Sequence, residues 1–343
     1  FIQPDSARNE VVAFVRRGLD DLSISRSKEK FDWGIDIPWD NGHITYVWFD
    51  ALLNYITAIG YGEESADAKA KFESLWPASV QVVGKDILRF HAVIWPAMLM
   101  AAGLAPANQV FGHGWLLVGG EKMSKSKLTG IAPSQITDTF GSDAFRYYFM
   151  KAIAFGSDGS FSWEDLSARY QAELANGFGN LASRVIAMVH RYFDGSLPAA
   201  GAFTEADLQV QNIAAQAVAN ADSAIGKVAI HDAISAIWTL VDELNNYITV
   251  QEPWVLAKDE STRERLATVL NTTVEGLRVL AVLLNPITPK ATAKLWAAIG
   301  GSLGSLDSQL TADAAKWGKF SAGAAIGELE ALFPRIETTE EAK

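Results

Sequence analysis

The hydrophobic pattern of this chain changes its period near residue 162, and that change restricts the fold more than any other feature. Between about residues 32 and 126, short β-branched and aromatic runs alternate with helical patterns, which is typical of parallel βα units. The expected strands are His43–Phe49, Val80–Val83 and Gln109–Phe111, and the expected helices are Ala51–Ile59 and Ile87–Ala102. This part of the chain therefore predicts an α/β domain with a parallel sheet.

From Ser162 onward, apolar residues recur at spacings of three and four, which predicts long helices. Ser162 with Asp165, and Thr204 with Asp207, have the pattern of helix N-caps. The first helix has an apolar face made of Leu166, Tyr170, Leu174, Phe178, Leu181, Val185, Met188 and Tyr192. Two later helices have faces made of Ile234, Trp238, Val241, Leu244 and Ile248, and of Leu266, Leu270, Val274, Leu277, Ala281 and Leu284. Short polar joints between such helices predict an antiparallel bundle.

Composition excludes several classes of protein. The 343 residues include no cysteine, so structural disulfides, thiolate nucleophiles and cysteine-based zinc sites are excluded. A formal net charge of −11 argues against a protein that coats DNA. No uninterrupted apolar run has the length of a membrane span, and the first residues lack a signal pattern, so we expect a cytoplasmic protein that binds no membrane. Because the chain begins at Phe1 rather than Met, we expect that an N-terminal part is missing.

The ends of the expected strands carry the side chains suited to chemistry. In an open parallel sheet, ligands bind beyond the carboxyl ends of the strands. Aromatic residues follow the first strand, a glycine and a carboxylate follow the second, and a glycine-hinged lysine loop follows the third. The residues at these ends are Trp48, Asp50, Ala51 and Tyr55, then Gly84, Lys85, Asp86, Ile87 and His91, then His113, Gly114 and Gly119–Lys127. This arrangement predicts an apolar ligand beside a nucleotide.

The segment Lys122-Met123-Ser124-Lys125-Ser126 is the most specific signal in the chain. Two lysines on a loop hinged at Gly119-Gly120 can close over a triphosphate, and the hydroxyls of Ser124 and Ser126 add hydrogen-bond donors. Such a clamp stabilises charge on a transferring phosphoryl group. A solvated basic loop is the alternative interpretation, which the hinge and the position after the last strand disfavour.

This segment is identical to the lysine-loop signature of class I aminoacyl-tRNA synthetases, and the surrounding blocks resemble the methionyl-tRNA synthetases. The blocks that carry the resemblance are Tyr46–Tyr55, Gly84–Ile87, Phe90-His91, Trp95–Ala97, Asn180–Arg184 and Pro253-Trp254. The resemblance extends from about Phe1 to the end of the bundle. It implies methionine activation by ATP to methionyl-adenylate, followed by transfer to tRNA(Met), including the initiator, in protein synthesis.

The resemblance also implies roles for residues of the α/β half. Methionine would be bound by Trp48, Ala51, Tyr55, Ile87 and His91. ATP would be bound by Lys125, Gly84, Asp86 and the backbone ledge His113, Gly114, Trp115 and Leu116. Catalysis would fall to Lys122, Lys125, Ser124 and Ser126. Aromatic edges and a thioether attract each other, which fits a methionine side chain in the first of these groups. ATP would arrive with Mg²⁺, and we expect neither a dedicated metal site nor a zinc site in this chain.

A second site is implied on the bundle. Asn176, Asn180 and Arg184 form a polar stripe at intervals of four residues. Asn180 and Arg184 match the family's anticodon-reading pair, and Trp254 matches its stacking tryptophan. An exposed tryptophan can stack on an unpaired base, while arginine and asparagine can bond to base edges. Without the resemblance, a solvated arginine and a core tryptophan are the simpler interpretation.

One departure affects the expected activity. The class uses a His-x-Gly-His motif for the ATP phosphates, and none of the histidines in this chain has that spacing. We therefore expect the isolated chain to be inactive without the N-terminal half of the catalytic domain. The expected layout is the end of a connective insertion (1–30), the second half of a Rossmann-type nucleotide-binding domain (31–130), a stem-contact module of two short helices (131–161), the anticodon-binding bundle (162–336) and an acidic tail (337–343).

Two alternatives stay open at this point. A tRNA-binding protein without catalysis would keep Asn180, Arg184 and Trp254 and could dispense with the two lysines. A different nucleotidyl transferase, or a class I synthetase for another apolar amino acid, would share the lysine loop without Trp48, Tyr55 and His91.

Overall fold

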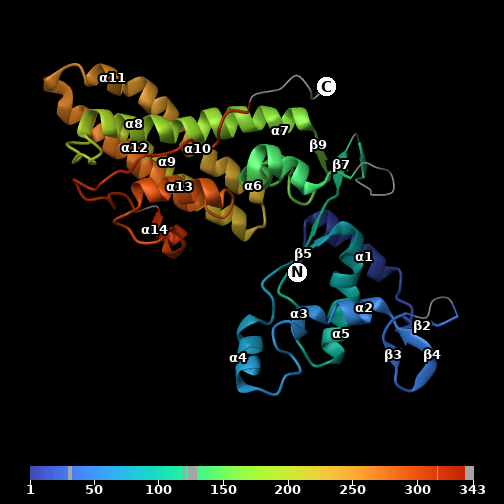
Figure 1. Cartoon of the computed structure of the whole chain (residues 1–343). Helices are drawn as coiled ribbons and strands as arrows, with labels where there is room; N and C mark the ends of the chain where they lie inside the picture. Colours follow the sequence, from blue (N-terminus) through green and yellow to red (C-terminus); the bar gives the residue numbers. More distant parts are fainter. Residues whose placement is uncertain (30–32, 119, 123–129, 315, 337–343) are drawn as a thin grey trace. The chain divides into compact units, whose positions relative to one another are not determined.

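The computed structural model describes residues 1–29, 33–118, 120–122, 130–314 and 316–336. The chain divides into two compact units, Phe1–Trp115 and Leu116–Lys343, drawn in Figure 1. Each unit is described by itself below. The first contains the strands and short helices of the α/β half, and the second contains the connecting module and the bundle.

A short parallel sheet organises the first unit. Its strands are β1 (Ile2–Gln3), β6 (Val110–His113) and β5 (Gln81–Gly84), in the order β1-β6-β5. The pairing is parallel throughout, with Ile2 opposite Val110 and Gly84 opposite His113. Helix α1 (Asp5–Arg16) buries Ala7 and Val11 in one cluster with Val83 and Val110. The prediction of a parallel sheet is therefore confirmed for the second and third expected strands, which pair with each other.

The prediction of a parallel strand at His43–Phe49 is wrong in two respects: the strand belongs to a different, antiparallel sheet, and it ends earlier. Strand β4 covers Asp40–Thr45 and pairs antiparallel with β2 (Ser25–Ser27) and β3 (Asp36–Ile37). The chain turns helical after Tyr46, because the next aromatic residue, Trp48, stacks on Phe90 instead of continuing the ladder. Packing contacts of this kind override strand propensity. The place in the parallel sheet is filled by β1, so the stretch assigned to an insertion begins with a sheet strand.

The helices of the first unit are short and irregular. They are α2 (Val47–Ala51), α3 (Asn54–Thr57), α4 (Ala66–Leu75), the 3₁₀ turn η1 (Lys85–Ile87), the π-helical turn η2 (Phe90–Ile94) and α5 (Trp95–Ala101). The expected helix Ala51–Ile59 is thus split in two, and the expected helix Ile87–Ala102 contains a change of helical type. Leu52, Ile56, Trp76, Trp95 and Leu99 form a second small core between these pieces.

The second unit begins with a small mixed sheet. Strand β7 (Leu116–Val118) pairs antiparallel with β8 (Glu121–Lys122) and parallel with β9 (Gly159–Phe161). Helix α6 (Pro133–Lys151) packs against it and is interrupted at Gly141, whose φ of 82° is not helical. Two helical pieces therefore stand where two short helices were predicted. Because β7 pairs with β9, the compact unit starts at Leu116, earlier than the predicted module boundary at residue 131.

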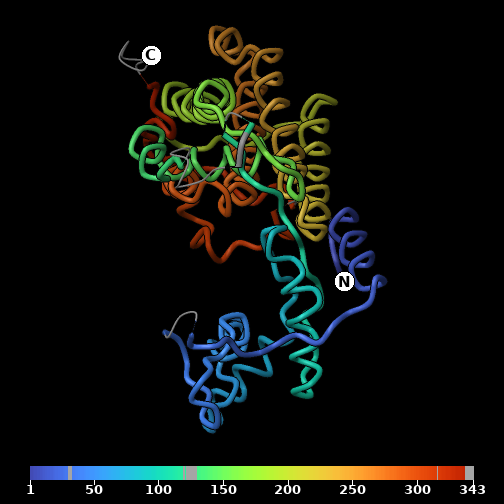
Figure 2. Tube along the Cα trace, turned by 90° about the vertical axis from the view of Figure 1, so that its right-hand side faces the viewer, coloured from blue at the N-terminus to red at the C-terminus, as the bar shows by residue number. Residues whose placement is uncertain are grey.

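Long helices make up the rest of this unit. They are α7 (Trp163–Arg169), the π-helical segment η3 (Tyr170–Gly179), α8 (Asn180–Phe193), α9 (Glu205–Gly226), α10 (Ile230–Gln251), α12 (Arg263–Leu284) and α13 (Pro289–Ile299). Shorter pieces are α11 (Pro253–Leu256), η4 (Glu260–Thr262), η5 (Leu306–Ser308) and α14 (Thr311–Ala314). Figure 2 shows the long helices of this unit gathered side by side. The predicted bundle is confirmed, as are both N-caps, at Ser162 and at Thr204.

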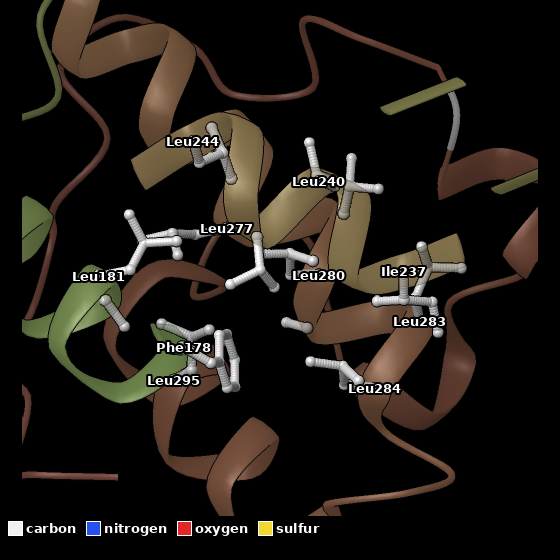
Figure 3. Close-up of a cluster of buried hydrophobic side chains, with 14 of the residues drawn as sticks. Phe178, Leu181, Ile237, Leu240, Leu244, Leu277, Leu280, Leu283, Leu284 and Leu295 are labelled. Atoms are coloured by element: carbon white, nitrogen blue, oxygen red, sulfur yellow. The ribbon is translucent and has the colours of Figure 1, made fainter. Parts of the chain in front are cut away.

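Helix α12 lies at the centre of the bundle. Leu277, Leu280 and Leu284 on α12 meet Phe178 and Leu181 from η3 and α8, and Leu240 and Leu244 from α10 (Figure 3). Among the described residues, one helical stretch, Glu260–Leu284, has the length and apolar character of a membrane span, and 94% of its most apolar window is buried inside the protein. Burial on all sides accounts for that composition.

Two glycines, Gly177 and Gly179, lie in the π-helical segment η3. A Cβ atom on Gly179 would lie 3.0 Å from the Leu174 carbonyl oxygen, and one on Gly177 would lie 3.3 Å from that of Ala172. In both cases the crowding carbonyl belongs to the residue five positions earlier, the spacing of a π-helical bond. Glycine is therefore the residue that this wider turn accommodates most easily.

Candidate functional site

A tyrosine and a histidine form the centre of the site in the first unit. Tyr55, from α3, places its hydroxyl oxygen 2.9 Å from Nε2 of His91, which lies in the π-helical turn η2. Their rings meet edge to face, with centroids 5.5 Å apart. Nδ1 of His91 lies 3.0 Å from the backbone carbonyl oxygen of Ile87. His91 is almost fully buried, at 2% exposure.

These contacts determine the protonation pattern of the pair. A carbonyl oxygen only accepts hydrogen bonds, so Nδ1 of His91 carries the proton and donates to Ile87. Burial lowers the pKa of His91, against a smaller opposing effect of the Ile87 hydrogen bond, and this favours the neutral ring. Nε2 is then an acceptor, and the Tyr55 hydroxyl donates to it. Burial also raises the pKa of Tyr55, so the hydroxyl keeps its proton. The pair offers a neutral, apolar surface whose tyrosine oxygen has lone pairs left to accept.

Other aromatic rings lie on the same group of short helical turns as this pair. Trp48, on α2, stacks on Phe90 with ring centroids 4.1 Å apart. Trp95 lies tilted beside Tyr55 at 6.2 Å between centroids. Ala51 ends α2 and Ile87 ends the 3₁₀ turn η1, so all five predicted methionine-binding residues come from this cluster of short helical turns. Sequence reasoning left Phe90 and Trp95 outside the site, although both stand in blocks that carried the resemblance.

Several residues that the sequence predicts to bind ATP lie where two parallel strands finish. Gly84 ends β5 and faces His113, which ends β6. A Cβ atom on Gly84 would lie 2.7 Å from a carboxylate oxygen of Asp86, so a side chain at this position would require the Asp86 carboxylate to move. Nδ1 of His113 donates to the Gly114 carbonyl oxygen at 2.8 Å. The ammonium of Lys85 lies 4.2 Å from the centre of a Trp115 ring.

Two predicted groups fall partly outside this description. Leu116, the last residue of the predicted adenine ledge, begins β7 in the second unit. Lys122 belongs to β8 and its backbone is placed opposite Leu117. Ser124, Lys125 and Ser126 lie outside the described residues.

The bundle separates the side chains of Asn180 and Arg184. Asn180 is exposed at the start of α8 and lines a hollow of about 170 Å³, which Asn176 and the segment 331–335 also line. Arg184 is directed to α10, where its guanidinium donates to Oδ1 of Asn245 at 2.8 Å. The Asn245 amide donates in turn to the carbonyl oxygens of Val241 and Gly177. Nε of Arg184 is buried and has no hydrogen-bond partner among the described residues.

Trp254 lies on the surface of the bundle. It is the second residue of α11 and is 41% exposed, while the preceding Pro253 is buried. Glu252, between α10 and α11, has left-handed backbone angles, with φ of 45°, and this residue turns the chain from one helix into the next. The interpretation of Trp254 as a core residue is therefore wrong.

Known proteins match the chain along nearly its whole length. The family described as "tRNA synthetases class I (M)" matches residues 2–186, and the family described as "Anticodon binding domain of methionyl tRNA ligase" matches residues 197–343. A methionine–tRNA ligase of Streptomyces coelicolor is 58% identical over 98% of this chain and 62% of its own length. One of Caldanaerobacter subterraneus subsp. tengcongensis is 45% identical over 99% of this chain and 52% of its own length.

A solved structure is similar too. Mycobacterium tuberculosis methionyl-tRNA synthetase in complex with methionyl-adenylate has a TM-score of 0.90 and 39% identity, over 98% of this chain and 64% of that one. This chain thus spans between about half and two thirds of the proteins that it matches. Both the α/β half and the bundle are matched by descriptions of one kind of enzyme, and the chain belongs to the methionyl-tRNA synthetase family of class I.

Proposed function

We propose that the protein activates methionine with ATP and transfers it to tRNA. The observation that carries this proposal is the neutral Tyr55–His91 pair, which lies beside Trp95 and on the same group of short turns as the stacked rings of Trp48 and Phe90. An unbranched thioether interacts favourably with aromatic edges, by about 0.3–1.5 kcal/mol per contact. Ala51 and Ile87 would complete the apolar walls, and, apart from Trp95 on α5, the group comes from α2, α3, η1 and η2.

The chemistry needs no protein nucleophile, because the methionine carboxylate attacks the α-phosphate of ATP and pyrophosphate leaves. Catalysis then consists of positioning the reactants and stabilising charge. Lys125 and Lys122 would carry the charge, with Ser124 and Ser126 as further donors. Gly84 would let the backbone approach the nucleotide, Asp86 would accept from a ribose hydroxyl or an ammonium, and His113–Leu116 would support the adenine.

The substrates and partners follow from the same proposal. Mg²⁺ would arrive with ATP as part of the substrate. The described residues contain no group of three or more acidic or histidine side chains that could hold a metal of their own. The bundle would receive the anticodon of tRNA(Met), including the initiator, through Asn180, Arg184 and Trp254. The reaction would take place in the cytoplasm and would require the N-terminal half of the catalytic domain.

A lysine substitution in the complete enzyme tests the catalytic part. Lys125→Ala should lower the rate of methionine-dependent ATP–pyrophosphate exchange by about 10²-fold or more, because charge on the phosphates loses its clamp. Methionine affinity should barely change. Lys127→Ala, two residues along the same loop, removes the same charge outside the signature and should retain nearly the full rate. Equal rates for the wild type and Lys125→Ala would contradict the proposal.

A further inference from the structure

Arg265 joins three helices at the end of the bundle where α10 stops. From α12, its guanidinium donates to both carboxylate oxygens of Asp207 on α9. The same group donates to the Tyr247 hydroxyl at 3.2 Å and to the side-chain oxygen of Gln251 at 2.8 Å, both on α10. Nε of Arg265 also donates to Gln251, at 3.2 Å. One side chain thus bonds to an acid, a phenol and an amide.

Asp207, the carboxylate in this network, is held in place by several hydrogen bonds. Asp207 is fully buried, and besides Arg265 it accepts from the Tyr247 hydroxyl and from the backbone and hydroxyl of Thr204. Hydrogen bonds to a charged group are stronger than neutral ones, and a planar guanidinium bound at two oxygens is fixed in direction as well as distance. Arg265 therefore presents its remaining donors to Gln251 from a rigid base.

Gln251 is the last residue of α10, and the chain turns immediately after it. Glu252 adopts left-handed angles, Pro253 is buried, and Trp254 follows on the four-residue helix α11. The far end of α11 is held separately, since the Thr262 hydroxyl donates to the Leu256 carbonyl oxygen at 2.7 Å. Trp254 consequently lies on a short span between two anchors, and Gln251 is the anchor on its N-terminal side.

We propose that Gln251 and Arg265 are positioning residues that fix the end of α10 so that the Trp254 indole is held ready to stack on a tRNA base. This inference rests on the proposed anticodon-reading role of Trp254. An exposed indole on an unanchored turn would have to be ordered when tRNA binds, and that ordering would weaken affinity. The hydrogen bonds that link Asp207, Arg265 and Gln251 order this turn before tRNA binds.

A double-mutant cycle in the complete enzyme tests the inference. Gln251→Ala removes the anchor and leaves the Asp207–Arg265–Tyr247 contacts in place. It should weaken cognate tRNA binding by about threefold to tenfold, less than the full value of a hydrogen bond to a charged group, because tRNA binding loses only the prior ordering of the indole. In a Trp254→Ala background, the same change should have no further effect, because Gln251 acts through the indole. Gln251→Glu keeps an acceptor for Arg265 and should restore the wild-type affinity.

Two comparisons make the result unambiguous. Asn271→Ala, also on α12, removes a hydrogen bond to the Pro198 carbonyl oxygen without touching α10 or α11, and should leave tRNA affinity unchanged. Independent, additive losses from Gln251→Ala and Trp254→Ala would overturn the positioning role while the reader role of Trp254 survives. If Trp254→Ala alone does not weaken tRNA binding, the reader role fails, and the positioning role fails with it.

Discussion

The two candidate sites differ in the hydrophobic cores on which their residues rest. In the first unit, Tyr55 and His91 lie on helical pieces of four and five residues, next to core clusters of a few side chains. In the second, Arg184 lies on the 14-residue helix α8, and the four-residue helix α11 that carries Trp254 joins two of the long helices that share one extended core around α12. Short elements allow several reactive groups to converge on a small ligand. Long packed helices instead keep a few exposed groups at fixed spacing, which suits a large nucleic acid. The comparison predicts that equal substitutions will cost unequal amounts in the two units.

The largest difference should appear in stability when matched leucines are truncated. Leu277 on α12 is completely buried within the large cluster, whereas Leu99 on α5 is buried in a small one. Leu→Ala changes cost about 2–5 kcal/mol, and the cost is lower where the surroundings can collapse into the space. We expect Leu277→Ala near the upper limit and Leu99→Ala near the lower, by chemical denaturation with fluorescence. Equal losses would remove the contrast between the two units.

Acid should weaken the bundle through Asp207. Burial raises the pKa of this carboxyl, but hydrogen bonds from Arg265, Tyr247 and Thr204 outweigh burial and hold the pKa at about 2. A carboxyl with a depressed pKa in the folded state adds stability above its unfolded pKa of ~4, and loses it as pH falls toward 2. The contribution is about 2 kcal/mol.

Asp207→Asn should therefore be less stable than the wild type at pH 6, and the difference should shrink as pH falls below about 4. Denaturation curves at pH 6, 4 and 3 measure it. Asp222→Asn, an exposed position on the same helix, should follow the wild-type profile. A difference that stays constant with pH would mean that the Asp207 charge does not hold the network together.

A smaller effect is expected at the Tyr55–His91 pair of the first unit. Tyr55→Phe removes the donor to Nε2 of His91 and leaves a buried acceptor without its partner. Such a loss costs about 1–3 kcal/mol locally. Because the surrounding core is small, we expect it chiefly as weaker methionine binding by the complete enzyme, with a higher KM for methionine in the exchange assay. Tyr61→Phe, on a more exposed tyrosine, is the control. An unchanged KM would dissociate the Tyr55–His91 bond from methionine recognition.

The smallest stability change should come from Trp254. Because its indole is 41% exposed, Trp254→Ala should alter the free energy of unfolding by no more than about 0.5 kcal/mol. The loss of stacking should still cost about 1–3 kcal/mol in tRNA binding. Denaturation and binding to cognate and anticodon-swapped tRNA, measured on the same variant, separate the two quantities. A loss of ~3–5 kcal/mol in stability would instead indicate a core residue.

Local signals in the sequence were sufficient where structure depends on neighbours in the chain. The caps at Ser162 and Thr204, the bundle helices and the parallel strands ending at Gly84 and His113 were all predictable from spacing and residue type. The run His43–Phe49 is not a single strand, because Trp48 stacks on Phe90 rather than extending a sheet. Propensity cannot distinguish these two environments.

Contacts between residues far apart in the sequence could not be predicted from the spacing of residue types. The sequence shows Asp207 as half of a cap with Thr204, but its bond to Arg265 joins residues 58 positions apart. Likewise, Tyr55 and His91 are 36 positions apart in the sequence, and His91 lies on a π-helical turn that the spacing of apolar residues does not predict. Here the resemblance to a known family placed the residues together, and physical pattern alone did not.

The π-helical segment η3 also sets the phase between α7 and α8. Successive residues of an α-helix are rotated by about 100°, so a wider turn shifts every later residue around the axis. Deleting one residue between Tyr170 and Gly179 would allow the segment to become a regular α-helix, and the additional rotation around the helix axis would be lost. The whole of α8 would then be turned relative to α7, and Arg184 would leave Asn245 although neither residue had been changed. The position of Arg184, a proposed anticodon-reading residue, is thus set by the length of a segment that ends about one and a half turns before it, as well as by its own side chain.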